Sequence, residues 1–257
     1  MDPATEHWTM AVFQVSPAFL VAVVVVGFFG FVVSATFGIG GVVLLIPLLS
    51  MVLPPAQAVA VSAPVMLVNN LGKTWVYRRH VDKRALFLVS ALAVPTAFVA
   101  ALFTSSVDDR VILLGVACLI LLSLVVERAR ARVTQFSDRA LLFWGLVTGV
   151  ISGLCGAAGP PTAIGLKGYG LTRERFVATV AVFAVLLQLA KVPAYLATDL
   201  LPARMWPLCA LLGVTAVVAV AVGPRLLRRV PEETFKHVVD GLLVVSAAWL
   251  IFEVVRR

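Results

Sequence analysis

Two polar motifs lie in the middle of otherwise apolar runs, and their residues are the ones best suited to bind a ligand. Asn69, Asn70 and Lys73 form the first motif, and Gln188 and Lys191 form the second. Residues three apart lie on one face of a helix, so each lysine shares a helix face with an amide. An amide donates hydrogen bonds and an ammonium group adds positive charge. The two motifs therefore predict recognition of a small anion.

Each motif also has a purely structural interpretation. Both lysines lie within about a turn and a half of a predicted helix end, from which a lysine stem can reach the membrane interface. The asparagines can instead hydrogen-bond to neighbouring helices. We favour the anion site because the amide and lysine pair occurs twice at the same spacing.

Two glycine-rich breaks interrupt apolar runs that are longer than one membrane crossing. The first break lies within residues 34–41 and the second within 152–161. A helix that begins at such a break offers free N–H donors and a partial positive charge, which suit an anion. Backbone of this kind is tolerated in a bilayer only where it is buried in protein or faces a wet cavity. Close helix packing through small residues is the alternative, and it explains two copies less well.

The predicted site combines both breaks with both polar motifs. Glycine at a break lets a ligand approach the backbone closely, and proline suits the first turn of the helix that follows. The predicted substrate-binding residues are Gly38, Gly40, Gly41, Asn69, Asn70, Lys73, Gly156, Gly159, Pro160, Gln188 and Lys191. Tyr77 and Tyr195 close the two polar helices. We interpret them as gates or, preferably, as aromatic anchors at the membrane interface.

Several kinds of chemistry have no support in the sequence. Among the predicted hairpins and crossings, Asp or Glu occurs only in 234–255, at Asp240 and Glu253, so neither a carboxylate proton relay nor a cation substrate is favoured. Zinc-binding spacings, nucleophile elbows and phosphate-binding loops are absent from the sequence. We therefore predict that the protein is not an enzyme and uses no metal and no cofactor.

The composition places these motifs in a helical membrane protein. Of its 257 residues, 61% are hydrophobic and only 13% are charged, whereas soluble domains contain about one quarter charged residues. Apolar runs of about 20 residues indicate transmembrane helices rather than a barrel. The net charge of +8 comes from Arg and Lys in short loops, which indicates the positive-inside bias and no nucleic-acid partner.

An internal repeat divides the chain into two halves. At a constant offset of 118 residues, Ser34 matches Ser152, Lys73 matches Lys191, and the first glycine break matches the second. The repeat predicts an all-α membrane fold of two inverted repeats, each a re-entrant helical hairpin followed by three transmembrane helices. The predicted parts are 1–126, a cytoplasmic basic linker 127–139, and 140–257.

Loop charges predict the orientation of these elements. The hairpins are expected at 17–53 and 140–167, and the crossings at 58–77, 85–103, 110–126, 175–197, 204–222 and 234–255. The basic loops should be cytoplasmic, namely 78–84, 127–139, 168–175 and 224–233. The loops at 104–109 and around Asp199 should lie outside, together with the C-terminus. Each half then crosses an odd number of times, which inverts the second half relative to the first.

Six segments of the chain carry a resemblance to a known family: Gly38-Ile-Gly-Gly-Val-Val-Leu-Leu-Ile-Pro47, Ala58-Val-Ala-Val-Ser62, Tyr77-Arg-Arg-His-Val-Asp82, Gly153-Leu-Cys-Gly-Ala-Ala-Gly-Pro-Pro161, Phe176-Val-Ala-Thr179 and Lys191-Val-Pro-Ala-Tyr195. In these segments the chain resembles the sulfite exporter TauE/SafE family of membrane transporters, over about residues 17–255. The resemblance implies transport of sulfite, sulfonates, sulfoacetate or related sulfur anions.

The expected function is therefore secondary transport of a small anion across the inner membrane. Alternating access is expected at a midplane site between the two hairpin tips. An anion channel without alternating states is the main alternative, and a membrane scaffold or enzyme subunit is a weaker one. The expected partners are the anionic substrate and the lipid bilayer, and a homodimer is left open.

Overall fold

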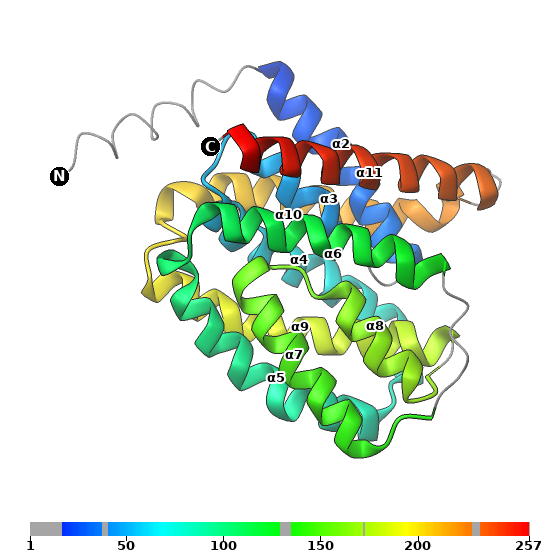
Figure 1. Ribbon diagram of the computed structural model, residues 1–257. Helices are drawn as coiled ribbons and strands as arrows, with labels where there is room; N and C mark the ends of the chain where they lie inside the picture. Colours follow the sequence, from blue (N-terminus) through cyan, green and yellow to red (C-terminus); the bar gives the residue numbers. More distant parts are fainter. Residues whose placement is uncertain (1–16, 38–40, 129–134, 172, 228–231, 257) are drawn as a thin grey trace.

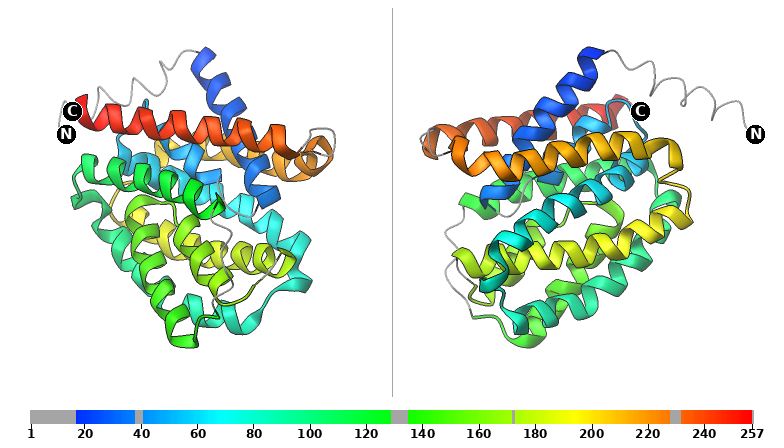
Figure 2. Two further views of the ribbon diagram at one scale, coloured as in Figure 1. Left: turned by 45° about the vertical axis from the view of Figure 1, so that its right-hand side comes forward. Right: turned by 180° about the vertical axis from the view of Figure 1, so that it is seen from behind.

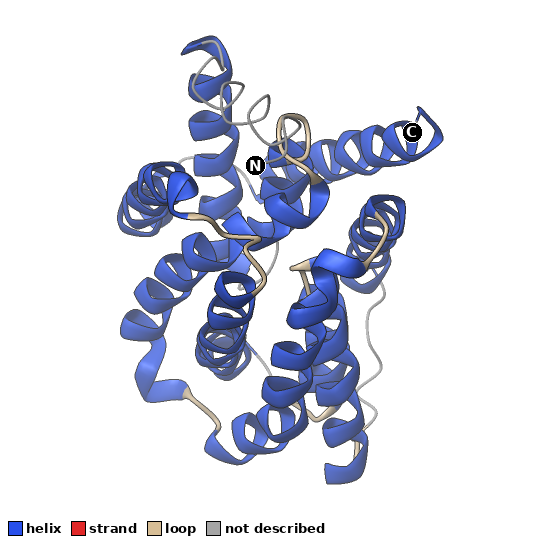
Figure 3. Cartoon of the chain, turned by 90° about the vertical axis from the view of Figure 1, so that its left-hand side faces the viewer, coloured by secondary structure: helices blue, strands red, loops and turns tan. Residues whose placement is uncertain are grey.

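The computed structural model describes residues 17–37, 41–128, 135–171, 173–227 and 232–256, and every regular element in these ranges is a helix (Figure 1). The long and short α-helices are α2 (Pro17–Phe37), α3 (Gly41–Leu49), α4 (Pro55–Tyr77), α5 (Lys83–Phe103), α6 (Asp109–Arg128), α7 (Asp138–Cys155), α8 (Gly159–Gly168), α9 (Arg173–Ala197), α10 (Trp206–Leu227) and α11 (Glu232–Arg256). Short loops join them (Figure 3). The prediction of an all-α fold is confirmed.

Both predicted breaks interrupt helices. The first separates α2 from α3, and the second separates α7 from α8. The helices that follow have 9 and 10 residues, which is about 15 Å of helix and about half of the hydrocarbon core of a bilayer. Each break is therefore followed by a helix that is too short to cross a membrane.

Five helical segments of the described chain are long and apolar enough to span a membrane: Lys83–Ser106, Asp109–Val126, Asp138–Cys155, Glu174–Ala197 and Ala203–Gly223. Four of them coincide with predicted crossings. The segment Asp138–Cys155 is instead the first arm of the second predicted hairpin, and its length and composition also suit a span. The protein is thus a multi-pass membrane protein, while the re-entrant geometry of the hairpins stays a prediction.

The first arm of each hairpin packs on the other half of the chain. The helix α7 packs along α5, and α2 packs along α10, while α4 contacts α9 and α6 contacts α11. Seen from behind, α10, α4, α9 and α5 lie side by side in that order (Figure 2). Shifting the chain by the repeat offset exchanges the first two contacts and preserves the last two. This packing agrees with a two-fold repeat, whereas its inverted orientation and the division at 127–139 stay predictions.

Small residues bring α5 and α7 into backbone contact. Gly149 and Gly153 face α5 at four-residue spacing, and a Cβ atom at Gly149 would collide with the carbonyl oxygen of Ala93. A Cβ atom at Gly153 would lie 2.7 Å from the carbonyl oxygen of Ala97. Both alanines are fully buried. These glycines of α7 therefore serve the close helix packing that is common in membrane bundles.

Polar contacts gather three loops at one end of the molecule. Arg84 Nη2 donates to Asp138 Oδ2 over 2.6 Å, and the Tyr169 hydroxyl donates to Asp138 Oδ1 over 2.9 Å. His80 lies 3.2 Å from a carboxylate oxygen of Glu174. The segments that carry these residues are three of those predicted to face the cytoplasm, and they do lie together.

Replacement of Gly149 by alanine tests the α5–α7 contact. The new Cβ atom has no room beside Ala93, so we expect Gly149→Ala to cost about 1–3 kcal/mol of folding free energy, as overpacking does. The thermal unfolding midpoint of the purified protein in detergent should fall by about 3 °C or more. The matched control is Gly241→Ala on α11, where no atom lies within 4 Å of the added Cβ. An equal midpoint for both variants would show that the contact is unimportant.

Candidate functional site

The first polar motif binds the end of α2. Lys73 is only 1% exposed, and its Nζ donates to Ser34 Oγ over 2.8 Å and approaches the Ser34 carbonyl oxygen at 3.5 Å. Asn69 Nδ2 donates to the same hydroxyl oxygen over 3.3 Å. Because Ser34 lies in the last turn of α2, the ammonium group faces the negative end of the helix dipole.

The second polar motif repeats this arrangement at the end of α7. Lys191 is 0% exposed, and its Nζ donates to the carbonyl oxygens of Ser152 and Gly156 over 3.4 and 3.3 Å. Ser152 is the repeat equivalent of Ser34, so each lysine binds the matching serine of its own half. Neither ammonium group reaches the surface, which excludes the interpretation that these lysines extend to the membrane interface.

No carboxylate balances the charge of either lysine within the described part of the chain. The ion pairs found there are Arg84–Asp138 and His80–Glu174, and both are partly exposed at the end of the molecule where the three loops meet. A buried charge is costly unless it is paired, and hydroxyl or carbonyl groups offset only part of that cost. Two buried ammonium groups without carboxylate partners favour an anionic ligand.

The predicted amides keep unused hydrogen-bonding capacity. Asn70 is 1% exposed, and neither its Nδ2 nor its Oδ1 has a partner in the described structure. Asn69 Oδ1 and Gln188 Oε1 are buried without a partner as well. Buried polar atoms in proteins almost always have partners, so these groups are candidates for binding a ligand or water. Among these unpaired amide atoms, Asn70 Nδ2 is the hydrogen-bond donor and the others are acceptors.

The second tip touches the first half of the chain. Gly156 ends α7 with a left-handed backbone at φ +74°, and its carbonyl accepts from Lys191. A Cβ atom there would lie 2.9 Å from Ile46 on α3 and 3.0 Å from Val59 on α4. Glycine is needed at this position for both its backbone conformation and its small size.

The helix α8 that follows this tip offers few N–H donors. Pro160 and Pro161 occupy its first turn and carry no N–H, so Gly159 is the single backbone donor among its first three residues. No side chain caps this end. The partial positive charge of the helix end remains, and proline suits this first turn, so substrate binding by Gly159 and Pro160 stays a prediction.

The first tip lies largely outside the described residues. Gly38 and Gly40 are predicted site residues for which the structure gives no description, and Gly41 begins α3. The two tyrosines differ from each other. Tyr77 is half-buried at the end of α4, whereas Tyr195 is fully buried and its hydroxyl donates to the Gly153 carbonyl oxygen over 2.6 Å. Tyr195 is therefore not an aromatic anchor exposed to lipid.

The two clusters lie at different levels of the molecule. The first, around Ser34, contacts α4 at Asn69 and Lys73, while Gly156 faces α4 at Val59 and Ser62. The helix between Ser62 and Asn69 is about 10 Å long. Within the described chain, no hydrogen bond joins one cluster to the other. A single midplane site between the tips therefore stays a prediction.

Sequence reasoning missed Thr104. This residue follows α5 and is fully buried, and its hydroxyl donates to the Gly153 carbonyl oxygen over 3.0 Å. A threonine just beyond a helix end is common and carries no signal of its own. The partner lies 49 positions away along the chain, so only the packing of α5 against α7 reveals the contact.

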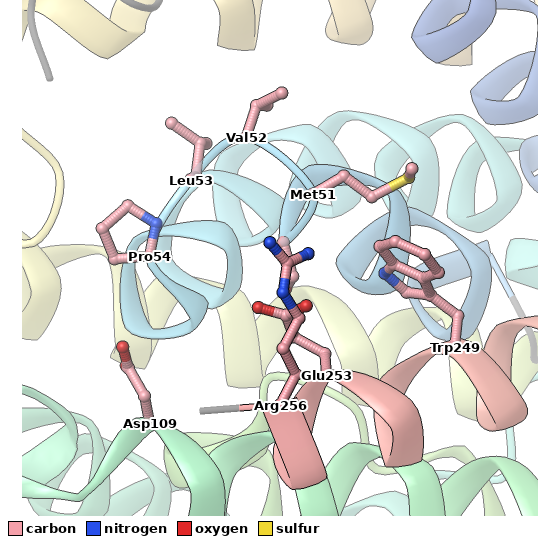
Figure 4. A pocket seen from close by; sticks show the side chains of 9 residues that line it. Met51, Val52, Leu53, Pro54, Asp109, Trp249, Glu253 and Arg256 are labelled. Carbon is pink, nitrogen blue, oxygen red and sulfur yellow. The ribbon is translucent and has the colours of Figure 1, made fainter.

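A pocket of about 520 Å³ opens where α3, α6 and α11 end or begin (Figure 4). It is lined by Ser50, Met51, Val52, Leu53, Pro54, Asp109, Trp249, Glu253 and Arg256. The indole ring of Trp249 and the carboxylate of Asp109 lie on opposite sides of it. No predicted site residue lines this pocket. It does bring together Asp109, from the loop 104–109 expected outside, and Arg256 near the C-terminus, which is expected outside as well.

Comparison with known proteins gives one match. A family model described as sulfite exporter TauE/SafE matches residues 23–250, which is most of the chain. The comparisons with curated proteins and with solved structures gave no match.

Alanine substitutions at two glycines with left-handed backbone distinguish the cost of backbone strain from the cost of close packing at the second tip. Gly156→Ala should destabilise the protein through both its φ of +74° and the collision with Ile46 and Val59. Gly170→Ala is the matched control, since its φ is +99° and no atom lies within 4 Å. The control should lose about 1–2 kcal/mol from backbone strain alone. Thermal unfolding should show the larger loss for Gly156→Ala, and equal losses would mean that the tip is loosely packed.

Proposed function

The chain belongs to the sulfite exporter TauE/SafE family and is a membrane transporter of sulfur anions, and we propose that it carries sulfite or a small sulfonate such as sulfoacetate. The observation that supports this substrate class best is the pair of buried lysines, Lys73 and Lys191, without carboxylate partners. The inner membrane is the proposed location.

The proposed ligand fits the groups that line the two clusters. Sulfite and sulfonates present three oxygen atoms that accept hydrogen bonds and share a negative charge. A lysine ammonium offers three donors and a compact charge, so it can keep its bond to Ser34 or Ser152 and still bind an anion. The free amide nitrogen of Asn70 adds a donor beside Lys73. The helix end at Gly159 adds a donor on the side of Lys191.

Two equivalent clusters at different levels of α4 suit a carrier. We propose that the anion is bound between them and is released toward one face or the other as the two halves rock. The predicted single site at the midplane becomes, in this proposal, the space between Lys73 and Lys191.

Removal of the two charges tests the proposed site. Lys73→Gln and Lys191→Gln keep a donor but lose the ammonium group. A charged hydrogen bond is worth about 1.5–3 kcal/mol, so each variant should slow sulfite or sulfoacetate uptake into proteoliposomes by about 10- to 100-fold. The control is Lys83→Gln, which changes the exposed first residue of α5 and should leave uptake unchanged. If both buried variants transport normally, the lysines do not bind the anion.

A counterflow experiment separates the carrier from the channel alternative. Vesicles that contain unlabelled sulfoacetate should accumulate labelled sulfoacetate transiently against its gradient, because a carrier exchanges one bound anion for another. Uptake should also saturate with substrate concentration. With the membrane potential held at zero, an anion channel would let the label equilibrate without transient accumulation, and it would pass steady current under an applied voltage.

A further inference from the structure

Two buried hydroxyl groups donate hydrogen bonds to one carbonyl oxygen near the second tip. Thr104 Oγ1 donates to the Gly153 oxygen over 3.0 Å, and the Tyr195 hydroxyl donates to the same oxygen over 2.6 Å. Thr104 comes from the first half of the chain and Tyr195 from α9 of the second. Both side chains are fully buried, so water does not compete for these hydrogen bonds.

The end of α7 explains why this carbonyl needs partners. The last carbonyl groups of a helix have no intrahelical N–H partner, and in a membrane bundle lipid supplies none. The Gly156 N–H donates a hydrogen bond to the Ser152 carbonyl oxygen, and Lys191 Nζ donates to the carbonyl oxygens of both Ser152 and Gly156. Gly153 receives the two hydroxyl groups, which use both lone pairs of its oxygen. Thr104, which follows α5, and two residues of α9, Tyr195 and Lys191, thus hold the end of α7.

We propose that Thr104 and Tyr195 are positioning residues, which clamp Gly153 so that the second tip is held in place to bind the transported anion. This inference rests on the proposed function for its link to the anion. Gly156 and the first residue of α8, Gly159, follow the clamped carbonyl directly along the chain. A fixed Gly153 therefore fixes the direction of the Gly159 N–H and of the α8 dipole.

The described residues that correspond to the clamp in the first half make no such hydrogen bonds. At the repeat offset, Tyr77 takes the position of Tyr195, but it is half-buried and its hydroxyl has no hydrogen bond in the described structure. The equivalent of Thr104 is Val222, which has no hydroxyl group and is exposed. The two bonds to Gly153 are therefore a particular feature of the second tip, and this difference favours a role beyond folding.

The test uses four variants and a matched control. Thr104→Val and Tyr195→Phe each remove one bond at nearly constant volume, and the double variant removes both. Thr104→Ser restores a hydroxyl group and should behave like the unmodified protein. Tyr77→Phe makes the same chemical change at the repeat-equivalent position, where no bond is lost. If the double variant does not fold, the single variants still carry the test, because each retains one of the two donors.

Two measurements separate the clamp from the proposed substrate. Hydrogen exchange of the purified protein without substrate should become at least about fivefold faster for amides of 153–159 in Thr104→Val and Tyr195→Phe, as loss of one hydrogen bond allows. Tyr77→Phe and Thr104→Ser should leave that exchange unchanged. Unchanged exchange in all variants would overturn the clamp, whatever the protein transports.

Transport kinetics then test the link to the anion. The substrate concentration at half-maximal uptake should rise by about fivefold in each single variant, while the maximal rate per folded molecule changes less than twofold. A purely structural role would lower only the yield of folded protein and its unfolding temperature. If sulfur anions are not transported by the unmodified protein, the proposed function fails, and the exchange measurement still decides whether the clamp exists. Faster exchange with an unchanged half-saturation value would overturn the positioning role.

Discussion

A helix that ends within a membrane bundle leaves carbonyl groups that lipid cannot satisfy, and the pairing of those groups governs the arrangement of this molecule. The ends of α2 and α7 are met by buried lysines, Lys73 and Lys191, from the helices that follow each hairpin. The lysines thus do two things at once. They compensate the negative helix ends, and they bring positive charge to places where an anion can bind.

The cost of those buried charges connects stability to function. Neither ammonium group contacts a carboxylate among the described residues, and Asn70 lies buried nearby with both polar atoms unpaired. A protein that had evolved only for stability would pair or remove such groups. The chain belongs to a family of sulfur-anion transporters, and an anion bound at the site that we propose would supply the missing charge and the missing acceptor.

The two halves make equivalent helix contacts, but these contacts differ in how the helices pack. Gly149 and Gly153 let α7 approach the backbone of α5, and Thr104 and Tyr195 bind the end of α7. In the first half, the residue equivalent to Gly149 at the repeat offset is the bulky Phe31. Equivalent helix contacts of the two halves therefore differ in their side-chain packing.

The sequence by itself determined the helical membrane class, the two glycine breaks and the equivalence of Lys73 with Lys191. These features follow from hydropathy, from glycine and proline, and from a constant offset, all of which are properties of the chain near each residue. Only the tertiary structure decided what those residues touch. Lys191 turned out to bind the end of α7 rather than reach the surface, and Tyr195 turned out to be buried rather than exposed to lipid. The contact of Thr104 with Gly153 depends on how α5 packs against α7, and no local pattern encodes the meeting of two segments so far apart in the chain.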